Sequence, residues 1–106
     1  MNPHDAIGYI IKHSGEFAAA KADRVYIEEF RKSKKALMMK DSRETTSAGQ
    51  ERDAYAHSEY IELLAGLKAA IEKEEVLKWM LVAAQARIEV WRTEQANNRT
   101  QDRLMK

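Results

Sequence analysis

The chain has 106 residues, of which 44% are hydrophobic and 33% charged, and its formal net charge is +1. This is the composition of one small folded domain rather than of a disordered segment. The sequence contains no cysteine, which excludes disulfides, thiolate metal sites and cysteine nucleophiles. Its first residues are too few and too polar for a signal peptide or a membrane span, so we expect a cytoplasmic protein without membrane association.

The first predicted element is a long helix over about residues 3–40. It opens with the stretch NPHD, in which Asn2 can cap the helix, Pro3 suits its first position and Asp5 lies near the positive end of the dipole. Apolar residues then recur at spacings of three, four and seven up to Leu37. These spacings are typical of a helix and not of a strand.

The next stretch, DSRETTSAGQ at residues 41–50, has no apolar periodicity and collects serine, threonine and glycine. Its composition predicts a loop over about residues 41–47. Ser47 and Gln50 match a capping box, which predicts that the second helix begins near Ala48.

We expect the second helix to run from about residue 48 to about residue 97, because Gly66 is the only glycine or proline in this range after Gly49. An alternative is a fresh helix start capped by His57 and Ser58, which would divide the range in two. The tail at residues 98–106 is polar and is expected to fray.

Two helices and one loop predict an all-α fold, a long antiparallel helical hairpin formed by a single domain over residues 1–106. The charges favour the same arrangement. Residues 21–43 hold eight Lys or Arg against four Asp or Glu, whereas residues 44–77 hold three against eight. Helices folded back on one another can pair these opposite charges.

The stretch LKWMLVAAQARIEVW, residues 77–91, contains both tryptophans. On a helical wheel its apolar residues cover roughly 220°, about twice the stripe that one helical neighbour requires. A second partner is therefore expected, and another copy of the chain is the commonest one. The hairpin would then dimerise, or form a higher homo-oligomer, as a four-helix bundle or a coiled-coil-like assembly.

Within this stretch we assign a role to each large side chain. The residues expected at the oligomer interface are Leu81, Ile88 and Trp91, and those expected to pack against the first helix are Trp79 and Val90. Base stacking and membrane binding are alternatives. They fit less well because the polar edge of the helix is not a basic one.

A basic stripe on the first helix is a candidate for nucleic-acid contact. Its residues are Lys21, Arg24, Arg31, Lys32 and Lys35. Such a stripe can follow a phosphate backbone, with Tyr26 or Phe30 supplying apolar contacts. Glu28 and Glu29 lie close to the stripe, and pairing with the acidic second helix would explain the same residues.

Catalysis has little support in the sequence, and we expect no catalytic residue, no metal and no cofactor. Two ExxE pairs, Glu59/Glu62 and Glu72/Glu75, are similar to the carboxylate sets of all-α nucleotide pyrophosphatases. Magnesium needs such pairs on facing helices, and these pairs follow one another without a turn between them. His4, His13 and His57 form no metal-binding motif, and Asp53 with His57 is an ordinary helical contact one turn apart.

The carboxyl half, residues 51–99, resembles a family of small helical proteins of proteobacterial tailed phages and prophages. The stretch LVAAQARIEVWRTEQANNR, residues 81–99, carries the resemblance most clearly. The resemblance implies a phage accessory factor linked to DNA metabolism, located in the host cytoplasm and able to bind a host or phage protein. The family has no catalytic residues to carry over.

Three hypotheses therefore follow from the sequence. The first is a non-catalytic, oligomeric helical binding or adaptor protein. The second is a nucleic-acid-binding protein that uses the basic stripe, and the third is a carboxylate-metal nucleotide hydrolase.

Overall fold

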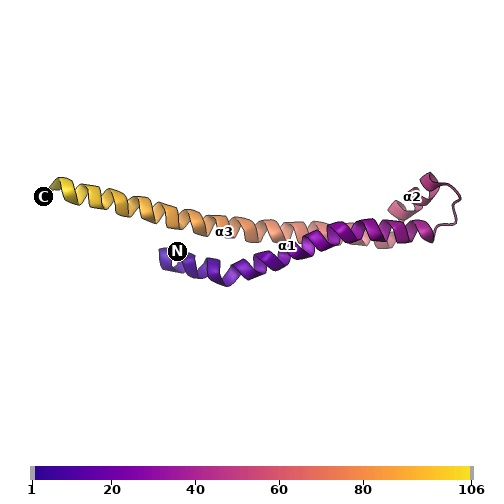
Figure 1. Cartoon of the computed structure of the whole chain (residues 1–106), viewed down its shortest axis with the longest axis horizontal. Helices are drawn as coiled ribbons and strands as arrows, with labels where there is room; N and C mark the ends of the chain where they lie inside the picture. Colours follow the sequence, from indigo (N-terminus) through magenta and orange to yellow (C-terminus); the bar gives the residue numbers. More distant parts are fainter. Residues whose placement is uncertain (1, 106) are drawn as a thin grey trace. The chain divides into compact units, whose positions relative to one another are not determined.

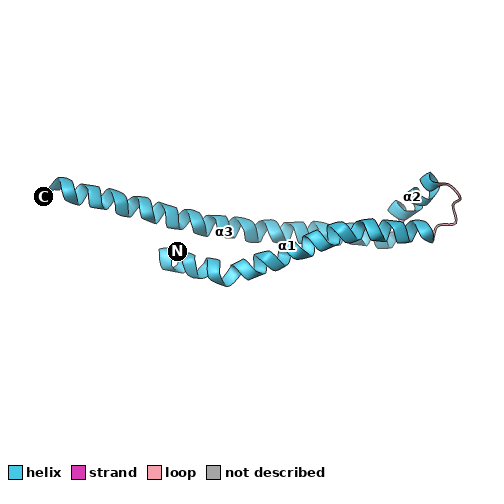
Figure 2. Ribbon diagram, viewed as in Figure 1, coloured by secondary structure: helices cyan, strands magenta, loops and turns pink. Residues whose placement is uncertain are grey.

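The computed structural model describes residues 2–105, and in this range it has three helices with short connecting segments and contains no strand (Figure 1, Figure 2). Helix α1 spans Pro3–Lys40, α2 spans Ser47–Ala56 and α3 spans Ser58–Met105. The predicted all-α fold is confirmed. Over residues 2–105, none of the helices has an apolar stretch that could span a bilayer.

Helix α1 has the bounds that the sequence predicts. The side chain of Asn2 accepts a hydrogen bond from the backbone N–H of Asp5 at 2.8 Å, which satisfies one of the N–H groups that the first turn leaves unpaired. Pro3 is the first helical residue, where its missing N–H costs nothing. Lys40 closes the last turn, at the negative end of the helix dipole.

Helix α2 begins one residue earlier than the capping box predicts. Thr46, not Ser47, is the N-cap, and its hydroxyl oxygen accepts the backbone N–H of Gly49 at 3.0 Å. Gly49 is buried, and a Cβ at this position would lie only 3.0 Å from atoms of Glu44 and Thr46. The cap therefore depends on both the threonine hydroxyl and the small glycine.

The prediction of one helix from residue 48 to residue 97 is wrong, because the chain breaks at His57. This residue has extended backbone angles, its N–H donates to the carbonyl of Ala54, and its Nδ1 accepts the N–H of Glu59 at 3.1 Å. His57 thus ends α2 and caps α3, as the alternative prediction proposed. Residues 98–105, expected to fray, are part of α3.

The chain divides into two compact units. One comprises the residues up to Ala18 together with those from Glu75 onward, and the other is Ala19–Glu74. Within each unit, a segment of α1 lies antiparallel beside a segment of α3, which is the pairing of the predicted hairpin (Figure 1). In the unit Ala19–Glu74, α2 lies beside these helices as a third element.

The pairing of α1 and α3 follows a heptad pattern. In α3, the residues from Tyr60 onward that are not exposed recur at alternating spacings of three and four: Tyr60, Leu63, Leu67, Ala70, Glu74, Leu77, Leu81, Ala84 and Ile88. A set in α1 recurs in the same way: Ala6, Ile10, His13, Phe17, Ala20, Arg24, Ile27, Arg31, Lys34 and Met38. Alternation of three and four residues is the core pattern of a coiled coil. We call these two sets the seam.

Candidate functional site

A second heptad-spaced set of residues lies on the exposed side of α3, within the unit that contains Glu75 and the residues after it. Its members are Val76, Trp79, Ala83, Ala86 and Val90, and we call this set the outer stripe. The large side chains of the outer stripe are 63%, 58% and 54% exposed for Val76, Trp79 and Val90, respectively. The outer stripe has the spacing that packs against another helix, but in this chain it is exposed.

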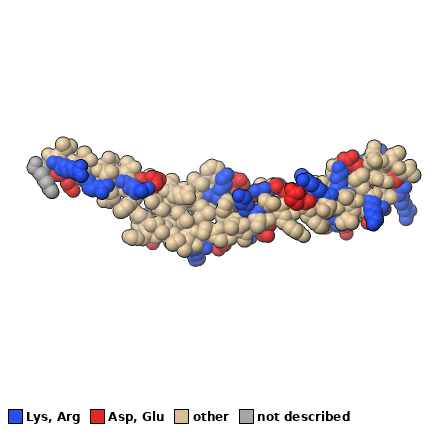
Figure 3. Space-filling model, in the orientation of Figure 1, with Lys and Arg blue, Asp and Glu red and all other residues tan. Residues whose placement is uncertain are grey.

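Further apolar side chains widen the outer stripe. Met80 and Val82 flank it on its two sides and are 48% and 40% exposed. At 1.5 Å per residue, the surface from residue 76 to residue 90 is about 21 Å long. Contiguous apolar surface of this kind marks an interaction site on soluble proteins. Outside the outer stripe, Ile7 and Ile11 on α1 of the same unit are also exposed, and the face drawn in Figure 3 shows few charged side chains over this end of α1.

The polar atoms on the outer stripe are hydrogen-bonded within α3 itself. The indole Nε1 of Trp79 donates to the Glu75 carboxylate at 3.0 Å. Thr93, which continues the outer stripe by one step, donates its hydroxyl to the backbone carbonyl of Glu89 at 3.1 Å. A partner could therefore cover Trp79 and the methyl group of Thr93 without leaving a buried donor unpaired.

The structure assigns the large side chains of residues 77–91 differently from the sequence prediction. Trp79 and Val90, expected to pack against the first helix, are instead more than half exposed, so this prediction is wrong. Leu81 and Ile88, expected at the oligomer interface, lie half-buried on the seam with the buried Ala84. Trp91 continues the seam spacing and is 43% exposed. Contact between copies stays a prediction, and the outer stripe is the better candidate for it.

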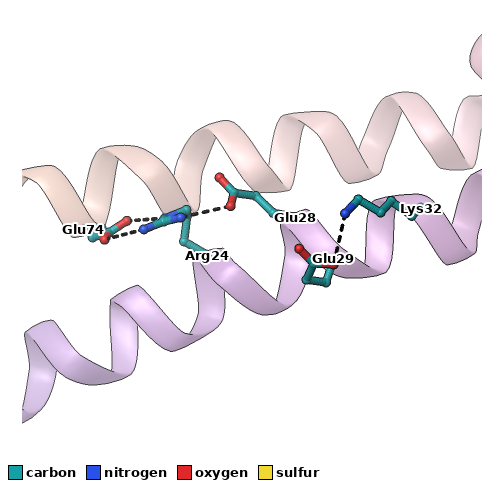
Figure 4. Close-up of polar contacts among 5 residues, drawn as sticks. All are labelled: Arg24, Glu28, Glu29, Lys32 and Glu74. Carbon is teal, nitrogen blue, oxygen red and sulfur yellow. Dashed lines mark hydrogen bonds and ion pairs between the residues drawn. The ribbon is translucent and has the colours of Figure 1, made fainter.

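The basic stripe on α1 is largely engaged with carboxylates. Arg24 donates from Nε and Nη2 to the two oxygens of Glu74 at 2.6 and 3.0 Å, and from Nη1 to Glu28 at 2.9 Å (Figure 4). The side chain of Glu74 is only 11% exposed and that of Arg24 23% exposed. The hydrogen bonds that Arg24 donates to Glu74 and to Glu28 raise the pKa of Arg24 above its ordinary value, so the guanidinium stays charged.

Two lysines of the basic stripe are also paired. The Nζ of Lys32 lies 3.2 Å from a carboxylate oxygen of Glu29 (Figure 4), and the Nζ of Lys35 lies 2.8 Å from a carboxylate oxygen of Glu51 in α2. The Nζ of Lys35 also lies 4.8 Å from the ring centre of Tyr55, a cation–π contact. The hydrogen bond to Glu51 raises the pKa of Lys35 and lowers that of Glu51. The interpretation of this segment as a helix face paired with acidic residues thus has direct structural support.

Three residues of the basic stripe nevertheless meet at one pocket in the unit Ala19–Glu74. The residues that line it are Arg31, Lys32, Lys35, Tyr55, Tyr60 and Leu64. Tyr55 and Tyr60 contact each other edge to face, with ring centres 5.4 Å apart. Cationic groups beside aromatic rings are suited to phosphate-bearing ligands. Of the other two predicted residues, Arg24 is bound to Glu74, and Lys21 lies exposed on α1.

Several of the carboxylates and histidines considered as metal ligands have other contacts. Glu59 binds Lys34 at 3.0 Å, which lowers the pKa of Glu59, and Glu75 accepts the bond from Trp79. Asp53 accepts a hydrogen bond from Ser42, and His57 caps α3. Over residues 2–105, no three histidine, aspartate or glutamate side chains are grouped so that they could hold a metal ion.

Comparison of the chain with protein-family models, with curated proteins and with solved structures finds no match.

Proposed function

We propose that the protein is a non-catalytic, self-associating helical adaptor whose binding surface is the outer stripe of α3. The observation that carries this proposal is the exposure of Val76, Trp79 and Val90 at heptad spacing on one helix. A helix with one apolar face needs one neighbour to cover that face, whereas α3 has two apolar faces and α1 covers only one of them. The simplest state that covers both faces is a homodimer or a higher homo-oligomer.

The resemblance of residues 81–99 to phage and prophage proteins supports a biological setting for this adaptor. We place it among phage accessory factors linked to DNA metabolism, acting in the host cytoplasm with a host or phage protein as its further partner. Residues 81–99 include Ala83, Ala86 and Val90 of the outer stripe. The part of the chain with the resemblance is therefore also part of the proposed binding surface.

Light scattering or sedimentation of the purified protein tests self-association. We expect a mass at least twice the 12.2 kDa of the chain at micromolar concentration. Trp79→Lys should reduce the mass to that of one chain, because a lysine ammonium on the outer stripe would lose its hydration in the contact. Glu75, one turn before it, would pair with the new lysine and help to preserve the helix.

Ile11→Lys is the matched control, since Ile11 is 74% exposed on α1 and lies outside the outer stripe. This variant should keep the mass of the unmodified protein. A single-chain mass for the unmodified protein, or equal dissociation of both variants, would contradict the proposal.

The basic pocket supports a second candidate function, the binding of nucleic acid. Arg31, Lys32 and Lys35 lie together there beside two tyrosine rings, and a phosphate backbone fits this combination of groups. Three of the five cations of the basic stripe already pair with carboxylates, so their positive charge is partly neutralised. We therefore rank this function second.

Binding of labelled single-stranded DNA and RNA at several salt concentrations tests the second candidate. Affinity should fall steeply as the salt concentration rises. In the double variant Arg31→Gln/Lys32→Gln, the slope of log affinity against log salt concentration should be shallower, by the amount that corresponds to the release of about two counterions. Arg99→Gln/Arg103→Gln, on the exposed end of α3, serves as the control with the same change in net charge. Equal slopes for the two double variants would rule out the pocket as the contact.

A further inference from the structure

We infer that the outer stripe binds the outer stripe of a second copy in an antiparallel, two-fold symmetric arrangement. In this arrangement Ala83 faces Ala86 of the second copy, Trp79 faces Val90 and Val76 faces Thr93. The inference rests on the proposed self-association and specifies its partner surface, direction and register.

The sizes of the side chains match when the outer stripe is reversed on itself. Its two alanines lie in the middle, and larger side chains lie toward both ends. Reversal about a point between residues 84 and 85 places Ala83 of each copy opposite Ala86 of the other. The two helices can therefore approach closely at the centre of the contact. The indole of Trp79 then packs on the branched side chain of Val90 in two equivalent layers. A parallel pair would place Trp79 against Trp79 in one layer and alanine against alanine in the next two, which packs less evenly.

The charges beside the outer stripe favour the same register. In the proposed arrangement Met80 flanks Arg87 of the second copy and Val82 flanks Glu89, so no like charges meet. If the copies slide by one heptad, to a centre at Leu81, Glu75 flanks Glu89 twice by symmetry. A parallel pair brings Glu89 beside Glu94 twice. Like charges placed together in an interface are unfavourable, so both alternatives are disfavoured.

The contact would also be large enough and dry enough to be stable. When the outer stripe is covered together with Met80 and Val82 on both copies, on the order of 1,000 Å² of surface is removed from water. This area is near the lower limit of specific interfaces. The Trp79 indole and the Thr93 hydroxyl keep their bonds to Glu75 and to the Glu89 carbonyl when they are covered. No buried polar atom of the outer stripe is left without a partner.

Single-cysteine variants test the register, because the sequence has no cysteine of its own. Val76→Cys and Thr93→Cys, mixed after dissociation and then oxidised, should give a cross-linked dimer, since facing residues can reach the Cα separation of about 4.4–6.8 Å that a disulfide needs. Val76→Cys alone should stay uncross-linked, because its two thiols would lie about 25 Å apart along the axis. Val76→Cys mixed with Ala86→Cys is the control for the register shifted by one heptad.

The possible results separate this inference from the proposed function. Cross-linking of Val76→Cys with itself would indicate a parallel pair, and preferred cross-linking with Ala86→Cys would indicate the shifted register; either result overturns the inference alone. A dimeric mass without any of these cross-links would mean that another face mediates association, which also overturns it. A single-chain mass for every variant and for the unmodified protein would overturn the proposed function as well.

Discussion

Arg24 and Glu74 occupy seam positions that a coiled coil usually fills with apolar residues. The guanidinium binds both oxygens of the carboxylate, which is the strong bidentate form of this pair, and Glu28 accepts a third bond. Desolvating two charges offsets most of the energy that such a pair gains. The pair also favours this register of the two helices, because sliding α1 along α3 within this unit would separate the two charges.

Lys35, Glu51 and Tyr55 form the corresponding polar contact between α1 and α2. Glu51 accepts the lysine N–H at 2.8 Å, and the pKa of this carboxyl lies below its ordinary value of 4.5 because the hydrogen bond and the charge of Lys35 favour the ionised form. Both side chains are partly exposed, at 30% and 45%, so salt in the solvent weakens the contact.

The thermal stability of the protein should therefore fall in acid. A carboxyl group whose pKa is lower in the folded state stabilises the fold above its unfolded pKa, and this contribution is lost as the pH falls through the folded pKa. Glu51 and Glu59 both have lowered pKa values, so the melting temperature should decline as the pH decreases below about 4.5. Glu51→Gln should have a lower melting temperature than the unmodified protein at pH 7. Its melting temperature should also fall less on acidification.

Glu62→Gln is a suitable control for this measurement, since Glu62 is an exposed carboxylate of α3. Melting curves recorded by circular dichroism between pH 7 and pH 3 give the comparison. If Glu51→Gln and Glu62→Gln had the same pH profile as the unmodified protein, the Lys35–Glu51 contact would contribute nothing to stability in solution.

The helices show which features are encoded locally in the sequence. The bounds of α1 could be predicted because its cap, Asn2, and its first residue, Pro3, act on backbone atoms within one turn. The sequence indicates the break at His57 only as an alternative to one continuous helix, because histidine is a weak capping residue. The capping box gives an N-cap one residue too late, because Thr45, Thr46 and Ser47 are all capable caps and the sequence does not distinguish them; in the structure the hydroxyl of Thr46 accepts the N–H of the buried Gly49.

The rotation of α3 about its axis could not be predicted in the same way. The apolar arc of residues 77–91 indicates that two faces are covered, but not which face meets α1. Earlier residues of the same continuous helix supply that information. Tyr60, Leu67 and Glu74 lie on the seam in the unit Ala19–Glu74, and heptad spacing from them reaches Leu81 and Ile88 and leaves Trp79 outside. The basic pocket was likewise hidden, since Tyr55 and Tyr60 reach it from helices on either side of the His57 break.

For the whole molecule, the interior is small in proportion to the chain. Among the described residues, the buried apolar side chains are those of Tyr60 and Leu67 and four alanines: Ala6, Ala20, Ala54 and Ala84. Burial of apolar surface supplies most of the favourable free energy of folding, and alanine contributes little of it. A second copy on the outer stripe would add large side chains to the buried set. Self-association would therefore also stabilise the fold.

This coupling predicts that the melting temperature rises with protein concentration. A partner that binds only the folded chain stabilises it by mass action, and each tenfold rise in concentration above the dissociation constant adds up to about 1.4 kcal/mol of apparent stability. Melting curves over about a hundredfold range of concentration should shift upward for the unmodified protein and for Ile11→Lys. Trp79→Lys should melt at a lower temperature that does not depend on concentration. If the unmodified protein also melted at one temperature throughout this range, a single chain would be the stable folded unit, and the exposed apolar side chains of α3 would need a different partner.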